Sequence, residues 1–221
     1  TPVDMADVNT KAAWEKSKGE GTIVAILDTG IDITHKDISG HIWTNQAETA
    51  GNKTDDDGNV YIDDINGWNF FNGDNQVHRQ DMAYDEWHGT HIAGIIAGVA
   101  PEAKIMPLKV FSNGTAYTSE IIEAIDYAEK NGAEIVNCSW GTTSDNPALK
   151  EAIEKSNMLF VSAAGNSNSN IGVNPVYPAS CSEDNVITVA SINKDNDLSG
   201  FSNYSEVSVD VAAPGENILS T

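Results

Sequence analysis

With 221 residues, of which 40% are hydrophobic, the chain is long enough to bury the core of one large globular domain. Its 33 acidic and 12 basic residues give a net charge of −21, which argues against nucleic acid and anionic membranes as partners. Such a charge favours cationic ligands or metal ions, or it serves only to keep the protein soluble. No apolar run approaches the roughly 18 residues of a membrane span, and the start resembles no signal peptide, as expected of a trimmed, mature chain.

Short runs of β-branched and aliphatic residues recur along the chain and are typical of strands buried on both faces of a parallel sheet. They cover residues 22–27, 105–110, 135–138, 159–164 and 186–190, with 209–213 as a further candidate. Helices are predicted between the strands, over residues 11–18, 90–98, 119–132 and 146–156. This alternation predicts an α/β fold with a mostly parallel central sheet.

Capping residues mark the ends of the predicted helices. Ser119 is the expected N-cap of one helix and Gly132 its C-terminal stop, while Pro147 takes the first position of the next. Residues 39–87 differ from the rest, because they form one long, polar and acidic stretch. A connection of that length is usually functional or held by a ligand.

Asp28 follows the first predicted strand in the segment V-A-I-L-D-T-G. Sites in open α/β sheets form at the carboxyl ends of strands, where a carboxylate can accept Nδ1–H from a histidine and hold its tautomer. Alone, D-T-G is a weak signal, because an Asp after a strand often serves as a cap or turn residue and the motif also occurs in aspartic proteases.

His88 begins the segment H-G-T-H-I-A-G, where we expect it to open a helix and act as a general base. The small residues Gly89, Ala93 and Gly94 predict close packing of that helix on the sheet, and His91 is expected to be a core histidine. A capping or surface role suits a lone His, but the pairing with V-A-I-L-D-T-G favours catalysis. Zinc is disfavoured, because H-x-x-H has no third ligand nearby.

Asn166 follows the strand predicted over residues 159–164, in A-A-G-N-S. Its side-chain amide can donate a hydrogen bond to a developing oxyanion. By itself, an Asn in a Gly-Asn turn is the better interpretation.

Further segments complete a pattern in order along the chain: V-A-I-L-D-T-G-I-D, H-G-T-H-I-A-G-I-I-A-G, V-N-C-S-W-G, V-S-A-A-G-N, Y-P-A-S, F-S-N-Y and V-A-A-P-G. With these motifs the chain resembles the subtilisin-like serine proteases, or subtilases, over nearly its whole length; their catalytic order is Asp, His, Ser. The resemblance implies a three-layer fold, hydrolysis of peptide bonds by acyl transfer, and an extracellular or cell-surface location.

The resemblance also implies roles for individual residues. Asp28 would be the orienting carboxylate, His88 the general base and Asn166 the oxyanion donor. Among the substrate-binding residues, Ser139, Trp140 and Gly141 would form a wall of the primary specificity pocket. A segment with Asn113, Gly114, Thr115 and Ala116 would pair with the peptide as an added strand. Phe111 and Tyr117 would lie at an upstream subsite.

The chain departs from the family pattern because no G-T-S-M-A nucleophile motif occurs in it. Residues 1–221 are therefore interpreted as a subtilase catalytic domain without the C-terminal part that carries the Ser. Three explanations remain open: a split or nicked protease completed by a second polypeptide, a truncated fragment, or a non-catalytic peptide-binding pseudoprotease. The intact Asp28, His88 and Asn166 favour the first two.

A calcium site is predicted in the acidic stretch D-D-D-G-N-V-Y-I-D-D, which also resembles a calcium-binding insert of some subtilases. Its expected oxygen ligands are Asp55, Asp57, Asn59, Asp63 and Asp64. The alternative is a solvated acidic loop. A different calcium-binding insertion that many subtilisins carry after the His-containing helix is missing here, although Asp37 resembles one of its ligands.

Two cysteines permit one disulfide at most, and they indicate no disulfide framework. Cys138 ends the apolar run I-V-N-C, which favours a buried free thiol. No Cys-His pattern suggests a cysteine nucleophile.

Overall fold

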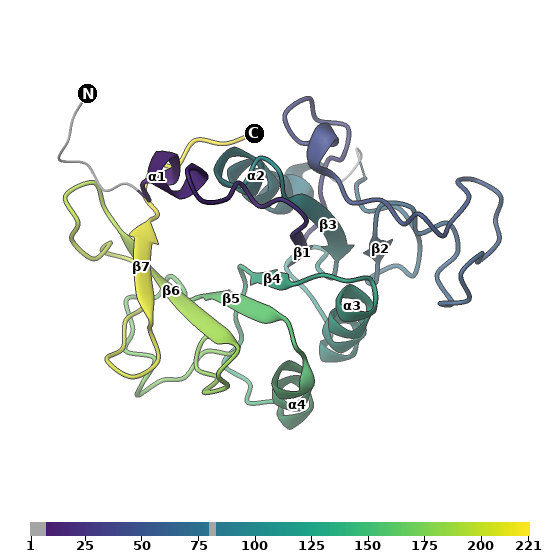
Figure 1. Ribbon diagram of the computed structural model, residues 1–221. Coiled ribbons are helices and arrows are strands. Elements are labelled where there is room, and N and C mark those ends of the chain that lie inside the picture. The colour runs from purple at the N-terminus through teal and green to yellow at the C-terminus, as the bar shows by residue number, and fades with distance from the viewer. Residues whose placement is uncertain (1–7, 80–82) are drawn as a thin grey trace. The chain divides into compact units, whose positions relative to one another are not determined.

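The computed structural model describes residues 8–79 and 83–221, and the chain divides into two compact units. Unit 1 combines the N-terminal segment up to Ser17 with Asn137–Leu219, and unit 2 combines Lys18–Val136 with Ser220–Thr221. Strands alternate with helices along the chain, and the pairs of named strands in each unit are parallel (Figure 1). The predicted α/β class with parallel strands is confirmed.

Unit 2 contains three strands in the order β2-β3-β1. Its elements are β1 (Ile23–Asp28), the 3-10 helix η1 (Ser39–His41), β2 (Trp68–Asn69), α2 (Ala83–Val99), β3 (Lys104–Lys109) and α3 (Thr118–Lys130). The register between β1 and β3 runs from Ile23 opposite Lys104 to Asp28 opposite Lys109. The parallel register thus brings the carboxyl ends of both strands to the same edge.

The core of unit 2 explains why β1 lacks alternation of polar and apolar residues. Five consecutive residues of β1, from Val24 to Asp28, are buried. A cluster of aliphatic residues packs β1, β3 and α2 together; it contains Ile26, Ile31, Ile38, Ile42, Ala93, Ala97 and Ile105. Strands that are covered on both faces read as continuous apolar runs, which is the pattern that identified them in the sequence.

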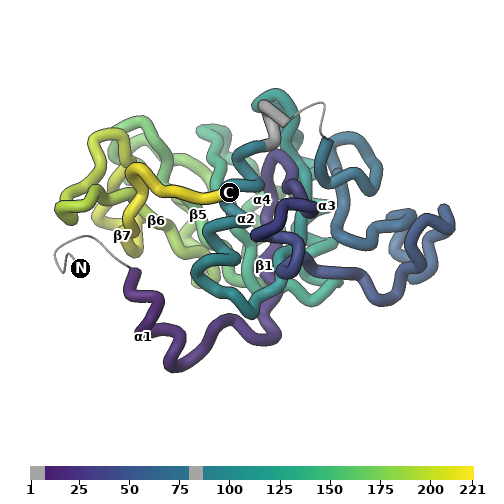
Figure 2. Tube along the Cα trace, turned by 90° about the horizontal axis from the view of Figure 1, so that it is seen from above, coloured from purple at the N-terminus to yellow at the C-terminus, as the bar shows by residue number. Residues whose placement is uncertain are grey.

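The long segment between η1 and α2 contains one short strand, β2, which the sequence did not indicate because only two residues pair. Figure 1 shows the blue part of this segment extending away from β2 and β3, and Figure 2 shows it reaching beyond α3. Edge-to-face aromatic contacts anchor it to α3, with Tyr127 as the common partner of Trp43, Tyr61 and Phe70. The segment is thus tied to the unit by a cluster of large rings, of which Phe70 and Tyr127 are buried.

Unit 1 contains three strands in the order β5-β6-β7. Its elements are α1 (Thr10–Trp14), α4 (Pro147–Lys155), β5 (Leu159–Ala163), β6 (Val186–Ile192) and β7 (Val211–Pro214), while β4 (Ile135–Cys138) spans the boundary between the units. Helix α4 begins as predicted, with Pro147 in its first turn and Asn146 accepting hydrogen bonds from the N–H groups of Ala148 and Leu149.

Two predicted helix starts were wrong. Helix α2 begins at Ala83, so His88 lies inside the helix and does not open it. Tyr117, without a side-chain cap bond, occupies the N-cap position of α3, and Ser119 lies one residue inside the helix. Both errors arise because helices can extend beyond the best capping residue when tertiary packing supports the extra turn.

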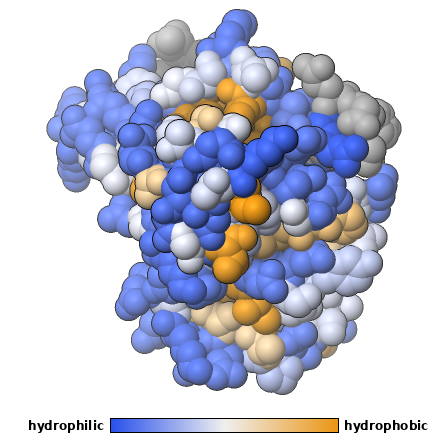
Figure 3. Space-filling view, turned by 90° about the vertical axis from the view of Figure 1, so that its right-hand side faces the viewer, coloured by the Kyte–Doolittle hydropathy of each residue, from blue (hydrophilic) through white to orange (hydrophobic). Residues whose placement is uncertain are grey.

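Hydrophilic side chains cover most of the face shown in Figure 3, in line with the acidic composition. Among the described residues, no helix combines the length and apolarity needed to cross a membrane. Cys138 is buried and Cys181 half-buried, and both are free thiols. Burial, together with neighbouring Glu183, raises the pKa of Cys181 to about 12, which keeps this thiol protonated and unreactive.

Candidate active site

Asp28 stands at the carboxyl end of β1 because the apolar run I-V-A-I-L ends there. Its backbone carbonyl accepts hydrogen bonds from the N–H groups of Val110 and Phe111, at 2.9 and 3.2 Å. Its carboxylate is almost fully buried, and Oδ1 accepts a hydrogen bond from the N–H of Thr29 at 2.7 Å. The strand ladder therefore fixes the position of the carboxylate, and both of its oxygens keep capacity for a side-chain partner.

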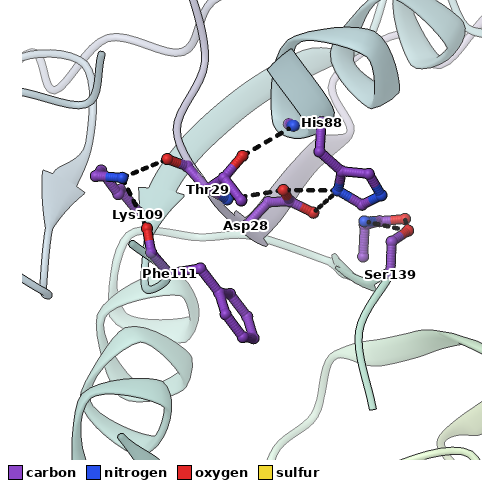
Figure 4. A network of polar contacts seen from close by, with 8 residues as sticks. Asp28, Thr29, His88, Lys109, Phe111 and Ser139 are labelled. Atoms are coloured by element: carbon purple, nitrogen blue, oxygen red, sulfur yellow. Dashed lines mark hydrogen bonds and ion pairs between the residues drawn. The ribbon is translucent and has the colours of Figure 1, made fainter. Parts of the chain in front are cut away.

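His88 is that partner. Its Nδ1 lies 2.9 Å from Oδ1 and 3.0 Å from Oδ2 of Asp28 (Figure 4). The His88 side chain is 39% exposed, against 2% for Asp28. A buried carboxylate on Nδ1 favours the tautomer that carries its proton there and leaves Nε2 as the basic atom. The structure thus brings together the two residues that the sequence paired.

The Asp28 carboxylate also sets the charge state of the imidazole. Its hydrogen bond raises the pKa of His88 above the ordinary value and its negative charge acts in the same direction, while partial burial opposes both. A raised pKa makes His88 a stronger base, which suits proton abstraction near neutral pH.

Gly89 allows α2 to approach the end of β1. A Cβ at this position would lie 2.3 Å from the carbonyl oxygen of Gly30 and 3.3 Å from the Cβ of Asp28. The N–H of Gly89 also faces the hydroxyl of Thr29, at 3.3 Å. The predicted close packing at Gly89 is therefore seen, and its contact is the turn that follows Asp28.

His91 differs from its expected role as a core histidine, because it is only partly buried. The exposed Trp87 ring packs edge-on against both imidazoles, with centroid distances of 5.5 Å to His88 and 6.3 Å to His91. His91 contributes to the site as a packing partner of Trp87.

Lys109 is a site residue that sequence reasoning missed. This side chain is 2% exposed, and its ammonium donates to the carbonyls of Thr29 and Phe111, the latter at 2.7 Å (Figure 4). It ties the turn after Asp28 to the segment after β3. The available signal was a Lys at the end of the apolar run I-M-P-L, opposite Asp28 in the register.

The segment after β3 contains the expected substrate-binding residues of unit 2. Ser112 and Thr115 exchange backbone hydrogen bonds of 3.0 and 2.9 Å, and Asn113 and Gly114 between them have positive φ angles of 49° and 70°. This is a tight turn of the kind that Asn-Gly favours. Asn113 and Gly114 lie in this turn, and the pairing of the segment with a bound peptide stays a prediction.

Apolar rings lie on either side of this turn. Phe111 is partly exposed, and Tyr117 is 57% exposed and stacks on Phe71 with a centroid distance of 6.1 Å. Tyr117 therefore offers an open aromatic face on unit 2.

Unit 1 contains the remaining predicted site residues, which follow β4 and β5. Ser139 exchanges hydrogen bonds with Asn137 at 3.0 and 3.2 Å, and Gly141 packs so closely that a Cβ would lie 2.6 Å from Val176. Asn166 is exposed, and its side chain has no hydrogen-bond partner within the described part of the chain. The amide of Asn166 is therefore available to a ligand.

The acidic loop (residues 45–64, in unit 2) brings some of the predicted metal ligands together. Oxygens of Glu48, Asp55 and Asp57 lie within 4.8 Å of one another and form a group able to hold a metal ion. Glu48 was missed, since it precedes the acidic run by several residues and joins it only through folding. Burial raises the pKa of Asp55, but hydrogen bonds from the backbone N–H groups of Val60, Gly58 and Asn59 outweigh it, so the pKa is lowered.

The other predicted ligands lie outside this group and hold the loop. Asp63 accepts hydrogen bonds from the N–H groups of Asn52 and Lys53. Asp64 is fully buried and accepts from the side chains of Asn45, Asn59 and Tyr127. Asn59 in turn donates to Asp57 as well as to Asp64. These hydrogen bonds hold the loop together, and the role of Asn59, Asp63 and Asp64 as metal ligands stays a prediction.

Comparison with known proteins relates this site to a family. The Subtilase family model matches residues 19–221. The Major intracellular serine protease of Bacillus subtilis (strain 168) is 37% identical over 239 residues, covering 100% of this chain and 66% of that protein. The Extracellular protease of Xanthomonas campestris pv. campestris is 33% identical over 252 residues, covering 98% of this chain and 40% of that protein.

A solved structure, of a cold adapted subtilisin-like serine proteinase, superposes with a TM-score of 0.71 at 27% identity, covering 93% of this chain and 67% of that one. The present chain thus spans about two thirds of the first relative's length, and its relatives include proteases named as intracellular and as extracellular. The match of sequence, fold and motif order leads to one conclusion: the chain belongs to the Subtilase family.

Proposed function

We propose that this chain provides the acid–base pair and the oxyanion donor of a subtilisin-like serine endopeptidase. The observation that carries the proposal is the buried Asp28 carboxylate within 3.0 Å of His88 Nδ1. Relatives named as serine proteases and the family match support it. The nucleophilic Ser is expected outside the given chain, in the remaining part of the natural protein or on a second polypeptide that completes the domain.

The proposed reaction is acyl transfer in two steps. His88 Nε2 takes the proton of the attacking Ser hydroxyl, while Asp28 holds Nδ1–H and stabilises the imidazolium that forms. The Ser oxygen bonds to the peptide carbonyl carbon, and the Asn166 amide donates to the resulting oxyanion. His88 then gives its proton to the leaving amine. Water attacks the acyl-enzyme in the same manner, releasing the carboxylic acid and returning the proton to Ser.

The proposed substrate is an extended peptide or protein. Ser139, Trp140 and Gly141 are proposed to line the primary specificity pocket, and the turn at Asn113–Thr115 to lie beside the bound peptide. The open aromatic face of Tyr117 supports an apolar upstream subsite near Phe111. The location outside the cell that the resemblance implies is supported by the relative named as extracellular, and cell fractionation of the source organism decides between it and an intracellular location.

A fluorophosphonate probe tests the proposed activity, because it labels only an activated Ser. The sample is the complete natural protein that contains this chain, compared with its His88→Ala variant. The matched control is His41→Ala, at the partly exposed 3-10 helix η1. We expect labelling and casein hydrolysis in the wild type and His41→Ala, and neither in His88→Ala. Absence of labelling in the wild type favours the pseudoprotease.

We also propose that Glu48, Asp55 and Asp57 bind Ca²⁺. Three converging carboxylates supply the hard oxygen donors that Ca²⁺ takes, and each carboxylate has more lone pairs than its hydrogen bonds use. Bound ion would neutralise the repulsion among these groups.

Thermal unfolding of EDTA-treated chain tests the calcium site. Saturating Ca²⁺ at about 100 times Kd should stabilise the wild type by about 2.7 kcal/mol. The shift should vanish in Asp57→Asn and persist in Asp126→Asn, a surface residue of α3. An unchanged Tm on adding Ca²⁺ to the wild type identifies a solvated acidic loop instead.

A further inference from the structure

Asn203 is a buried polar residue of unit 1, in the segment F-S-N-Y that no catalytic role explains. Its side chain is 1% exposed. All the hydrogen-bonding capacity of a buried amide has to be met inside the protein, so its partners reveal what it holds. Those partners lie on the loop after β5, which carries Asn166.

The contacts of Asn203 bracket Asn166 on both sides. Before Asn166, the side-chain amide donates to the carbonyl of Ala164 at 2.8 Å, and the Asn203 backbone N–H donates to the carbonyl of Gly165 at 2.8 Å. After Asn166, Asn203 Oδ1 accepts from the N–H groups of Ser167 and Ser169, both at 3.0 Å. Asn166 itself stays exposed between these anchored neighbours.

Gly165 shows how closely the two segments approach. Its φ is +103°, and an added Cβ would lie 2.5 Å from the Asn203 side-chain nitrogen. Backbone bonds continue the attachment, from the N–H of Asn168 to the carbonyl of Phe201 and from the N–H of Tyr204 to the carbonyl of Ser169. The loop lacks regular secondary structure, so these bonds fix its backbone.

We propose that Asn203 is a positioning residue that fixes the oxyanion donor Asn166, an inference that rests on the proposed function. Asn203 touches neither the substrate nor the reacting atoms in this scheme. It removes the freedom of the Asn166 backbone, so that the amide points in one direction before the oxyanion develops. A donor aimed in advance costs no reorganisation during the reaction, which is the source of its catalytic effect.

A double-mutant cycle on the complete natural protein tests this coupling. Asn166→Ala should lower kcat by about 10²–10³-fold with little change in KM. Asn203→Ala should lower kcat at least about tenfold, because a misplaced donor loses most of its effect. In the Asn166→Ala background, Asn203→Ala should change kcat less than about twofold, because the residue it positions is absent.

Two further variants distinguish a loss of positioning from a general loss of folding. Asn203→Asp keeps the acceptor for Ser167 and Ser169. Burial favours the neutral form of this acid, whose O–H can donate to the Ala164 carbonyl, so its kcat should fall less than that of Asn203→Ala. Asn170→Ala is the matched control, since its side chain accepts only from Gly172 in the same loop. Its kcat should equal that of the wild type.

The outcomes separate this inference from the function on which it rests. If Asn166→Ala leaves kcat unchanged, the oxyanion role of Asn166 fails. A second outcome is that Asn166→Ala lowers kcat, but each Asn203 variant lowers kcat by the same factor in the wild type and in the Asn166→Ala background. Asn203 then acts on the fold alone, and the positioning role is overturned. The same conclusion follows if the Asn203 variants only raise KM. Where Asn203→Ala does not fold, the same cycle with Asn203→Asp gives the decision.

Discussion

The end of β1 and the acidic loop both concentrate carboxylates in unit 2, but they use them differently. At the end of β1, the sheet ladder satisfies the backbone, so Asp28 needs one backbone partner and turns its remaining capacity to His88. In the acidic loop no ladder exists, and Glu48 and Asp55 each accept several backbone N–H groups.

The difference explains why a single Asp at the end of β1 can serve the His88 imidazole, whereas the acidic loop needs many carboxylates to accept hydrogen bonds from its own backbone. Backbone N–H groups must be paired wherever they are buried. Regular strands pair them without side chains, whereas an irregular loop takes acceptors from its Asp and Glu residues. The Asp28 carboxylate can bind His88 because the strand ladder has already met most needs of the backbone around it.

The largest effect on kcat is expected when the negative charge at the end of β1 is removed. Asp28→Asn should lower kcat of the complete natural protein about 10⁴-fold, because an amide favours the wrong tautomer of His88. Asp126→Asn, with a side chain 62% exposed, is the matched control and should leave kcat unchanged. A decrease smaller than tenfold for Asp28→Asn would contradict the orienting role.

The second largest effect on catalysis is expected when a methyl group is added at Gly89, beside the Asp28 carboxylate. Gly89→Ala places a Cβ against the Gly30 carbonyl, so α2 must shift and kcat/KM should fall about 100-fold. Gly98→Ala in the same helix meets nothing within 4 Å and should raise stability by about 0.5–1 kcal/mol. Equal behaviour of the two variants, in kinetics and in urea unfolding, would refute the close approach at Gly89.

For the acidic loop the expected effect is on stability. Burial and the hydrogen bond to Asp64 raise the pKa of Tyr127 far above its ordinary value, so its hydroxyl remains a donor. Tyr127→Phe leaves the buried Asp64 with one partner fewer, which should cost about 1–3 kcal/mol in urea unfolding. Tyr61→Phe, at a half-buried ring of the same aromatic cluster, should cost less than about 0.5 kcal/mol. Similar losses in both variants would contradict a specific contribution of the hydrogen bond between Tyr127 and Asp64.

The smallest expected effect is a displacement along the pH axis. Because Asp28 raises the pKa of His88, the imidazole should titrate above an ordinary His in NMR of this chain, and Asp28→Asn should move its midpoint to lower pH. Activity needs neutral His88 and should rise with pH through that midpoint. The stability from the pair has the opposite sign: it is complete below the unfolded pKa and is lost as pH rises through the folded pKa. An unchanged midpoint in Asp28→Asn would mean that the carboxylate does not set the charge of His88.

The amino-acid sequence by itself determined the parallel α/β class, the elements near their observed positions, the pairing of Asp28 with His88 and the family. These features follow from local patterns: continuous apolar runs, capping residues and short motifs at the ends of strands. The tight turn at Asn113 and Gly114 was not predicted, because the family resemblance led us to expect only a segment that pairs with the peptide.

Apart from Asp28 and His88, only the tertiary structure decided which polar groups meet. Glu48 joins Asp55 and Asp57, Lys109 reaches the turn after Asp28, and Asn203 holds the loop of Asn166 from 34 to 39 residues away in sequence. Buried polar groups select partners by three-dimensional proximity and must be satisfied wherever the fold leaves them. No periodicity along the chain encodes such pairs, so the positions of their side chains become known only when the strands and loops are assembled.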